Sequence, residues 1–210
     1  MHPQKPAQYP SCSNSTFQPR RTSSLYRHII PSVNSSSIPL DLFEQPCPSM
    51  FLTRVTPRCK NLAPWVTVAV VNLTDRPKPV TLPLSAEVLN SMQGSKFFIF
   101  DFFSQKPLGI FDAGARINLG DLAAHDSRLL RVAPWTADKP ILAGTDLHFS
   151  GGVEITSWHP GQKDVSGSIE TKWNYPVRVT AAFAADNAEG CVVNTAVLQP
   201  GRKEFRIAGP

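Results

Sequence analysis

The sequence predicts an all-β protein, an antiparallel β-sandwich preceded by a disordered N-terminal leader. Short runs rich in β-branched and aromatic residues begin at Trp65 and continue to the end of the chain. Nearly all of these runs are flanked by Gly, Pro, Asn or Asp, and successive runs are spaced about ten residues apart. This pattern is typical of sandwiches and barrels. No helical period is sustained over about 12 residues, and strands do not alternate with helices. A TIM barrel and a Rossmann domain are therefore excluded.

The N-terminal residues 1–37 differ in composition from the rest of the chain. They are rich in Ser, Pro, Gln and Arg and poor in aliphatic residues, a composition that cannot repay the entropy of ordering a core. We expect them to be disordered. They contain four basic residues and no acid, so they carry +4 of the formal charge of +5 and leave +1 for the rest. Because the rest is nearly neutral and lacks a clustered basic surface, it is not expected to bind nucleic acid.

The length of the chain and the absence of common sequence motifs restrict the function classes that fit it. With 210 residues, 41% of them hydrophobic, the chain is long enough for one domain with one core. The four cysteines lack metal-ligand spacing, and GxGxxG, GxxxxGK(S/T), HExxH and GxSxG are absent. No apolar run approaches the ~20 residues of a membrane-spanning helix. We therefore expect no cofactor, no structural zinc and no membrane partner.

The predicted elements can be followed along the chain. Residues 65–72 alternate in polarity and are closed by the turn formers of 72–77 before the run 80–84, which predicts a hairpin. The aromatic run 96–103 predicts a strand with Asp101 as its only charge. The other predicted elements are a helical turn at 85–91 and strands at 107–111, 115–119, 127–133, 140–149, 153–158, 165–173, 176–184, 191–198 and 204–208.

A cluster of chemically active side chains lies in the segment 146–154. On a strand, Asp146 and His148 are two residues apart and share a face. The position of Glu154 depends on the turn at 150–152: a two-residue turn points it away from His148, and a three-residue loop places it opposite His148. In the second case the three residues can meet as metal ligands or as an acid/base pair. In the first case they form the polar side of a hairpin, with Asp146 bonded to nearby backbone.

Two tryptophans are candidate sugar contacts. Trp158 and Trp173 each stand at the end of a predicted strand, where an exposed indole offers a flat face to a sugar ring. The alternative is that each ring seals the edge of the core. His125 directly precedes Asp126, and we expect it to be a turn residue before the strand 127–133.

Four segments resemble a known family in both order and spacing. They are IPLDLFEQPCPSMFLTRV, PWVTVAVVNLTDRPKPVTLPL, KFFIFDFFSQKPLGIF and LAAHDSRLLRVAPWTADKPILAGTDLHFSGGVEI. The set is similar to the C-terminal β-sandwich of α-galactosidase (melibiase)-like glycoside hydrolases, over roughly residues 38–208. NLTD stands where the family has NWTD, and DFFS where it has DFWS. The resemblance implies that 38–62 is the junction between a catalytic barrel and the sandwich, and that 63–210 is the sandwich domain.

In that family a (β/α)8 barrel precedes the sandwich and carries both catalytic Asp residues, so no position of this chain matches a catalytic residue. The resemblance implies a non-catalytic accessory domain, a fragment or truncated paralogue, whose partner is the missing catalytic barrel. Without the barrel it should expose an apolar face and self-associate. Two alternatives stay open: a module that binds carbohydrate or protein through exposed Trp158 and Trp173, and an autonomous metal-dependent enzyme that uses Asp146, His148 and Glu154.

Overall fold

The computed structural model describes residues 36–42, 44, 47–89, 92–170, 174–185 and 190–210. Within them almost every regular element is an antiparallel strand, so the all-β prediction is confirmed. The predicted disordered leader, residues 1–37, lies outside the described residues except for its last two positions. No helix in the described part of the chain is long and apolar enough to cross a membrane.

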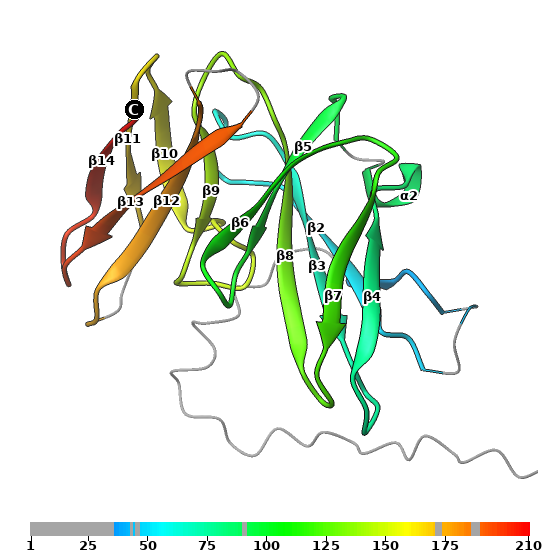
Figure 1. The fold of residues 1–210 in the computed structure, drawn as a ribbon. Coiled ribbons are helices and arrows are strands. Elements are labelled where there is room, and N and C mark those ends of the chain that lie inside the picture. The colour runs from blue at the N-terminus through cyan, green and yellow to red at the C-terminus, as the bar shows by residue number, and fades with distance from the viewer. Residues whose placement is uncertain (1–35, 43, 45–46, 90–91, 171–173, 186–189) are drawn as a thin grey trace, which may run out of the picture.

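The first half of the structure is a sandwich built on a six-stranded sheet (Figure 1). Its elements are β1 (Ile38–Pro39), β2 (Met50–Val55), β3 (Trp65–Val71), β4 (Lys78–Pro83), α2 (Ala86–Leu89), β5 (Lys96–Asp101), β6 (Lys106–Asp112), β7 (Arg116–Leu122) and β8 (Ser127–Pro134). The large sheet has the order β1-β2-β3-β8-β5-β6, and β4 pairs with β7 in the second sheet. Val66 and Val68 of β3 share the core with Leu82 of β4 and Val88 of α2. The segment 38–62 contributes β1 and β2 to this sandwich.

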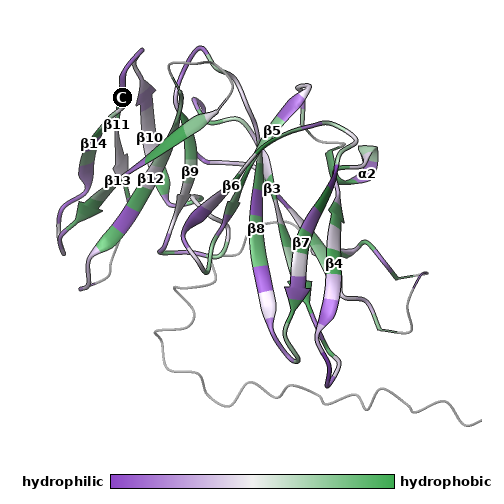
Figure 2. Cartoon of the chain, in the orientation of Figure 1, coloured by the Kyte–Doolittle hydropathy of each residue, from purple (hydrophilic) through white to green (hydrophobic). Residues whose placement is uncertain are grey.

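The second half is a smaller sandwich of two three-stranded sheets. Its strands are β9 (Ile141–Thr145), β10 (Ile155–Pro160), β11 (Asp164–Ile169), β12 (Val177–Ala184), β13 (Cys191–Leu198) and β14 (Glu204–Ala208). The sheet orders are β13-β12-β9 and β10-β11-β14. Val179 and Phe183 of one sheet share a core with Ile155, Val165 and Ile207 of the other. Figure 2 shows hydrophobic stretches along strands of both halves.

The chain buries two large hydrophobic clusters rather than the single core expected from its length. The physical reason lies in strands such as β5, which is apolar on both faces and therefore needs cover on both. On the outer face of the six-stranded sheet, Thr67, Arg131 and Phe100 lie opposite one another on β3, β8 and β5, and all three are buried. The second sandwich covers them: a Cβ added at Gly144 of β9 would lie 3.1 Å from Phe100 Cδ1.

The hairpin predicted between 65–72 and 80–84 is wrong. β3 pairs with β2 and β8, whereas β4 pairs with β7 in the facing sheet. β3 is buried on both faces, with Val66, Val68 and Val70 in the first core and Trp65 and Thr67 on the opposite face. It therefore takes a central position with two neighbours. The helical turn predicted at 85–91 is confirmed as α2.

Asn72 stabilises the crossover connection between β3 and β4 by hydrogen bonds. Its Nδ2 lies 2.8–3.0 Å from the carbonyl oxygens of Arg76, Leu122 and Ala123. Its Oδ1 accepts hydrogen bonds from the backbone N–H and the hydroxyl of Thr74. The residue is only 1% exposed, so water cannot easily replace these partners.

The substitution Asn72→Ala should therefore destabilise the protein by about 2–3 kcal/mol, because several backbone groups lose a partner at once. Urea unfolding measures the loss. Asn118→Ala is the matched control, since Asn118 is exposed and its Oδ1 accepts one hydrogen bond from the Gly120 N–H. Equal losses for the two variants would contradict the role of Asn72.

Candidate functional site

The segment 146–154, which joins β9 to β10, is a loop between two sheets and not a hairpin. β9 pairs with β12, and β10 pairs with β11 in the other sheet of the second sandwich. β9 ends at Thr145, so the expectation that Asp146 and His148 share a strand face is wrong. Neither of the two turn geometries considered for Glu154 applies, because the flanking strands do not pair.

Close packing against the six-stranded sheet shapes this loop. Gly151 and Gly152 have φ of +70° and +139°. A Cβ at Gly151 would lie 2.9 Å from Arg131 Cδ, and one at Gly152 would lie 2.4 Å from Leu142 Cδ2. The two glycines therefore allow the backbone to approach buried side chains that a larger residue would displace.

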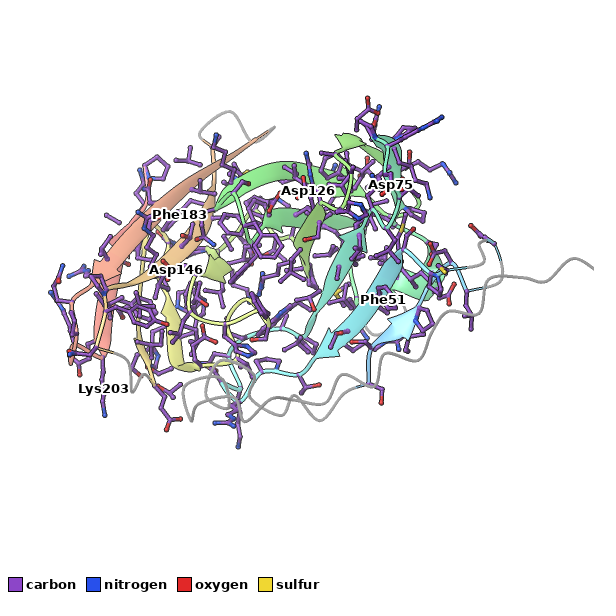
Figure 3. All side chains as sticks on the ribbon, turned by 90° about the horizontal axis from the view of Figure 1, so that it is seen from below. Phe51, Asp75, Asp126, Asp146, Phe183 and Lys203 are labelled. Atoms are coloured by element: carbon purple, nitrogen blue, oxygen red, sulfur yellow. The ribbon has the colours of Figure 1, made fainter. Side chains whose placement is uncertain are left out.

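Asp146 connects the start of the loop 146–154 to β12 by hydrogen bonds. Its Oδ1 accepts a hydrogen bond of 2.8 Å from the backbone N–H of Arg178, and its own N–H donates to the Arg178 carbonyl oxygen at 3.3 Å. In Figure 3 Asp146 appears on the same side of the molecule as Phe183 of β12. The carboxylate thus bonds nearby backbone, as in the hairpin alternative, although the backbone belongs to a different strand.

His148 is held by Ser150. Its Nδ1 accepts a hydrogen bond of 3.0 Å from the Ser150 backbone N–H and lies 2.8 Å from the Ser150 hydroxyl oxygen. Burial lowers the pKa of His148 to about 4, so the ring is neutral and a weak base at neutral pH. A Ser–His hydrogen bond resembles a nucleophile and its base. Here, however, Nε2 has no partner within the described ranges, and both residues are buried. The pair therefore serves to shape the loop.

Glu154 has one satisfied and one unsatisfied carboxyl oxygen. Thr145 Oγ1 donates a hydrogen bond to Oε1, whereas Oε2 is buried and finds no partner in the part of the chain that the structure describes. Burial raises the pKa of Glu154 to about 7, even though the Thr145 hydrogen bond lowers it. The charge of Asp146 raises this pKa further, and the charge of Arg131 lowers it. At neutral pH the carboxyl is therefore close to half protonated.

Arg131 is a candidate functional residue that sequence reasoning missed. It is 4% exposed, its Nη1 donates to the Leu142 carbonyl oxygen at 2.5 Å, and its guanidinium carbon lies 4.4 Å from the centre of the Trp65 ring. Its Nε is buried and has no partner among the described residues. Burial lowers the pKa of Arg131 to about 9 while Glu154 raises it, so the side chain stays charged at neutral pH. The available signal was a charge inside the apolar run SRLLRVA.

The structure does not bring Asp146, His148 and Glu154 together as one site. Asp146 influences the pKa of Glu154, but His148 is bonded to Ser150 and to neither carboxylate. Over the described ranges, no group of three or more His, Cys, Asp and Glu side chains is arranged to hold a metal ion. The trio is therefore arranged neither as metal ligands nor as an acid/base pair.

Of the two candidate sugar-contacting tryptophans, the structure describes Trp158, and this ring is buried. Trp158 is 1% exposed and packs against Phe205, with ring centroids 6.0 Å apart, so it does not offer an open face to a sugar. Trp173 lies outside the described residues.

His125 is a turn residue before β8, in agreement with the prediction from its sequence context. Its φ is +57°, and its Nε2 lies 2.8 Å from Asp75 Oδ1 rather than beside Asp126. Both side chains of this pair are largely exposed. In Figure 3 Asp75 and Asp126 lie apart from Asp146, and His125 is bonded to Asp75, so His125 is separate from the loop 146–154.

A cavity of about 500 Å³ lies between the two sandwiches, and we call it the junction cavity. Among the described residues, it is lined by the loop 61–64 before β3, by Met92 and Gln93, by residues of 131–142 running from β8 into β9, and by Trp158 and Pro160 of β10. Most of the lining side chains are apolar. The charged ones are Arg131 and Lys139.

The fold and the site together define an all-β protein in which two packed sandwiches bury polar groups and form a cavity where they meet. No family model matches the chain, and no curated protein matches it. Among solved structures, it is weakly similar to the crystal structure of a protein from Bacillus halodurans provisionally named an alpha-N-acetylgalactosaminidase. The TM-score is 0.33 and the identity 17%, over 41% of this chain and 18% of that chain. The similarity is limited to this short stretch.

Proposed function

We propose that this chain is a non-catalytic accessory β-sandwich of an α-galactosidase-like glycoside hydrolase. The proposal rests on the positions that the family-like segments take in the fold. They form β1, β2, β3, β4, β5, β6, β8 and β9, which make up most of the first sandwich and the strand that leads into the second. Segments that belong together in the family therefore also pack together here, as expected of one inherited domain.

An exposed aromatic patch, formed by Phe102, Phe103 and Phe149, supports a docking role. The three rings contact one another edge-on, with centroids 5.3–6.3 Å apart. Phe103 is 55% exposed and Phe149 is 46% exposed. Aromatic side chains gathered on a surface are typical of interfaces with a partner protein. The patch fits the expectation that a catalytic barrel covers an apolar face of this domain.

The purified chain should not hydrolyse 4-nitrophenyl α-galactoside, and it should self-associate through the aromatic patch. The double variant Phe103→Ser/Phe149→Ser should shift the chain toward monomer, because it removes most of the exposed ring surface. Light scattering coupled to size-exclusion chromatography measures the mass. Leu73→Ser is the control, since Leu73 is 57% exposed but is not part of the patch. Turnover by the wild-type chain, or a wild type that is already monomeric, would contradict the proposal.

Docking can be tested directly with a (β/α)8 barrel of an α-galactosidase expressed without its own sandwich. Co-expression with this chain should increase the yield of soluble barrel and the two should elute together. Phe103→Ser/Phe149→Ser should lose both effects and Leu73→Ser should keep them. If the barrel is equally soluble with and without the wild-type chain, the accessory role is wrong.

A further inference from the structure

Arg131 places a buried cation in the wall of the junction cavity. The residue lines the cavity, is 4% exposed, and has an Nε that finds no partner in the described part of the chain. A buried charge that the protein does not fully pair costs free energy, and an anion bound beside it in the cavity would offset part of that cost. The accessory role proposed above makes no use of this cation.

The charge of the cavity wall favours an anion. Arg131 and Lys139 are the charged residues in its lining, and both are basic. Glu154 is the acid that acts on Arg131, but no direct ion pair joins them and its pKa of about 7 leaves it partly neutral. Asp138 is fully exposed, takes a hydrogen bond from Thr136 and does not line the cavity. The guanidinium charge is therefore incompletely neutralised by the protein itself.

The rest of the wall favours an apolar body. Leu62, Ala133, Ile141, Leu142 and Trp158 line it, together with several prolines. A volume of about 500 Å³ falls within the range of small-molecule sites, which combine apolar walls with a few polar groups that fix orientation. One buried planar guanidinium matches the two oxygens of a carboxylate better than a phosphate dianion, which needs more donors.

We propose that the junction cavity binds a small organic acid, with its carboxylate on Arg131 and its apolar body against Leu62, Leu142 and Trp158. Lys139, which is exposed, lies at the solvent side of the cavity and attracts the carboxylate as it enters. The site lies between the two sandwiches, so a bound acid also ties them together. It needs neither the catalytic barrel nor the aromatic patch.

The probes are 4-phenylbutyrate and 4-phenylbutan-1-ol, which share an apolar body and differ in the acidic group. Titration calorimetry of the full chain at about pH 6, where Glu154 is mostly protonated, should show the acid binding about tenfold to hundredfold more tightly than the alcohol. Tryptophan fluorescence should change in the same titration, because Trp158 lines the cavity.

Four variants locate the site. Arg131→Met should abolish the preference for the acid over the alcohol, and Arg131→Lys, which keeps the charge without the planar fork, should weaken acid binding. Lys139→Gln should weaken acid binding about twofold to fivefold. Ala63→Phe, at an exposed position of the lining, should weaken both probes by filling the cavity. Lys163→Gln is the control, since Lys163 is exposed and does not line this cavity.

The proposal fails if neither probe binds the wild-type chain, or if the acid and the alcohol bind equally. It also fails if inorganic phosphate competes as strongly as 4-phenylbutyrate, because the site would then take a bare oxyanion. If loss of the buried Arg131 prevents folding, Lys139→Gln and Ala63→Phe carry the test, and wild-type affinity in both would overturn it. None of these outcomes depends on whether the chain docks on a barrel.

Discussion

Replacement of Gly152 by alanine should destabilise the protein by about 2–4 kcal/mol, among the largest effects expected of a single methyl group here. Gly152 has a φ of +139°, a conformation that residues with a Cβ rarely adopt. Its added Cβ would lie 2.4 Å from Leu142 Cδ2 and 3.9 Å from Trp65 Cη2. Leu142 and Trp65 are both buried, so neither can move away without disturbing the packing between the sandwiches. Urea unfolding at constant temperature measures the loss.

Gly114→Ala separates the backbone effect from the packing effect. Gly114 also has a positive φ, +84°, but nothing lies within 4 Å of an added Cβ, so the expected loss is only about 1 kcal/mol. Leu142→Ala should cost less in the Gly152→Ala background than in the wild type, because it removes the atom that the new methyl meets. Losses of the same size for Gly152→Ala and Gly114→Ala would show that the loop is not packed as described.

The positions of the strands could be predicted from the sequence because they depend on local patterns. The alternation in 65–72, the aromatic run 96–103 and the punctuation by Gly, Pro, Asn and Asp each correspond to strands of the structure. Their pairing could not be predicted in the same way. The turn formers of 72–77 are equally suitable for a hairpin and for a crossover, and only the burial of both faces of β3 decides for the crossover.

The contacts within the candidate site were even less predictable from the sequence than the strand pairing. Asp146, His148 and Glu154 were candidates because they are close in sequence. Their hydrogen-bond partners, however, are Arg178, Ser150 and Thr145, and none of these is a member of the trio. The contacts that organise the site are long-range. Trp65 Nε1 donates to the Ser150 carbonyl oxygen at 2.6 Å across 85 positions of the chain. No local pattern contains such a contact.

Arg131 illustrates why a buried charge is hard to see in a sequence. In the run SRLLRVA, Arg128 and Arg131 look alike as charges at the edge of an apolar strand. Arg128 lies opposite Val70 and is half-buried, whereas Arg131 lies opposite Thr67 and Phe100 on the face that the second sandwich covers. The difference arises only when the second sandwich packs on the sheet, which a pattern of period two does not reveal.

Glu154→Gln should gain stability relative to the wild type as the pH rises from 4.5 to about 7, by up to roughly 3 kcal/mol. Folding raises the pKa of this carboxyl from 4.5 to about 7, chiefly because the carboxyl is buried. Within that window the folded state keeps a proton that the unfolded state has released, so the stability of the wild type falls as the pH rises. Glutamine is neutral at every pH and avoids this loss. Urea unfolding of both proteins between about pH 4.5 and pH 8 measures the difference.

His148→Asn should show the opposite trend and serves as the counterpart. Burial lowers the pKa of His148 from 6.5 to about 4, so the unfolded state binds a proton that the folded state does not, and wild-type stability is lost as the pH falls through this range. The variant should therefore gain on the wild type toward low pH. Between 4.5 and 6.5 the two groups offset each other in the wild type, and only the variants separate them. A stability difference between Glu154→Gln and wild type that stays constant with pH would mean that the Glu154 carboxyl is solvated, and the packing of the loop 146–154 against the six-stranded sheet would then be wrong.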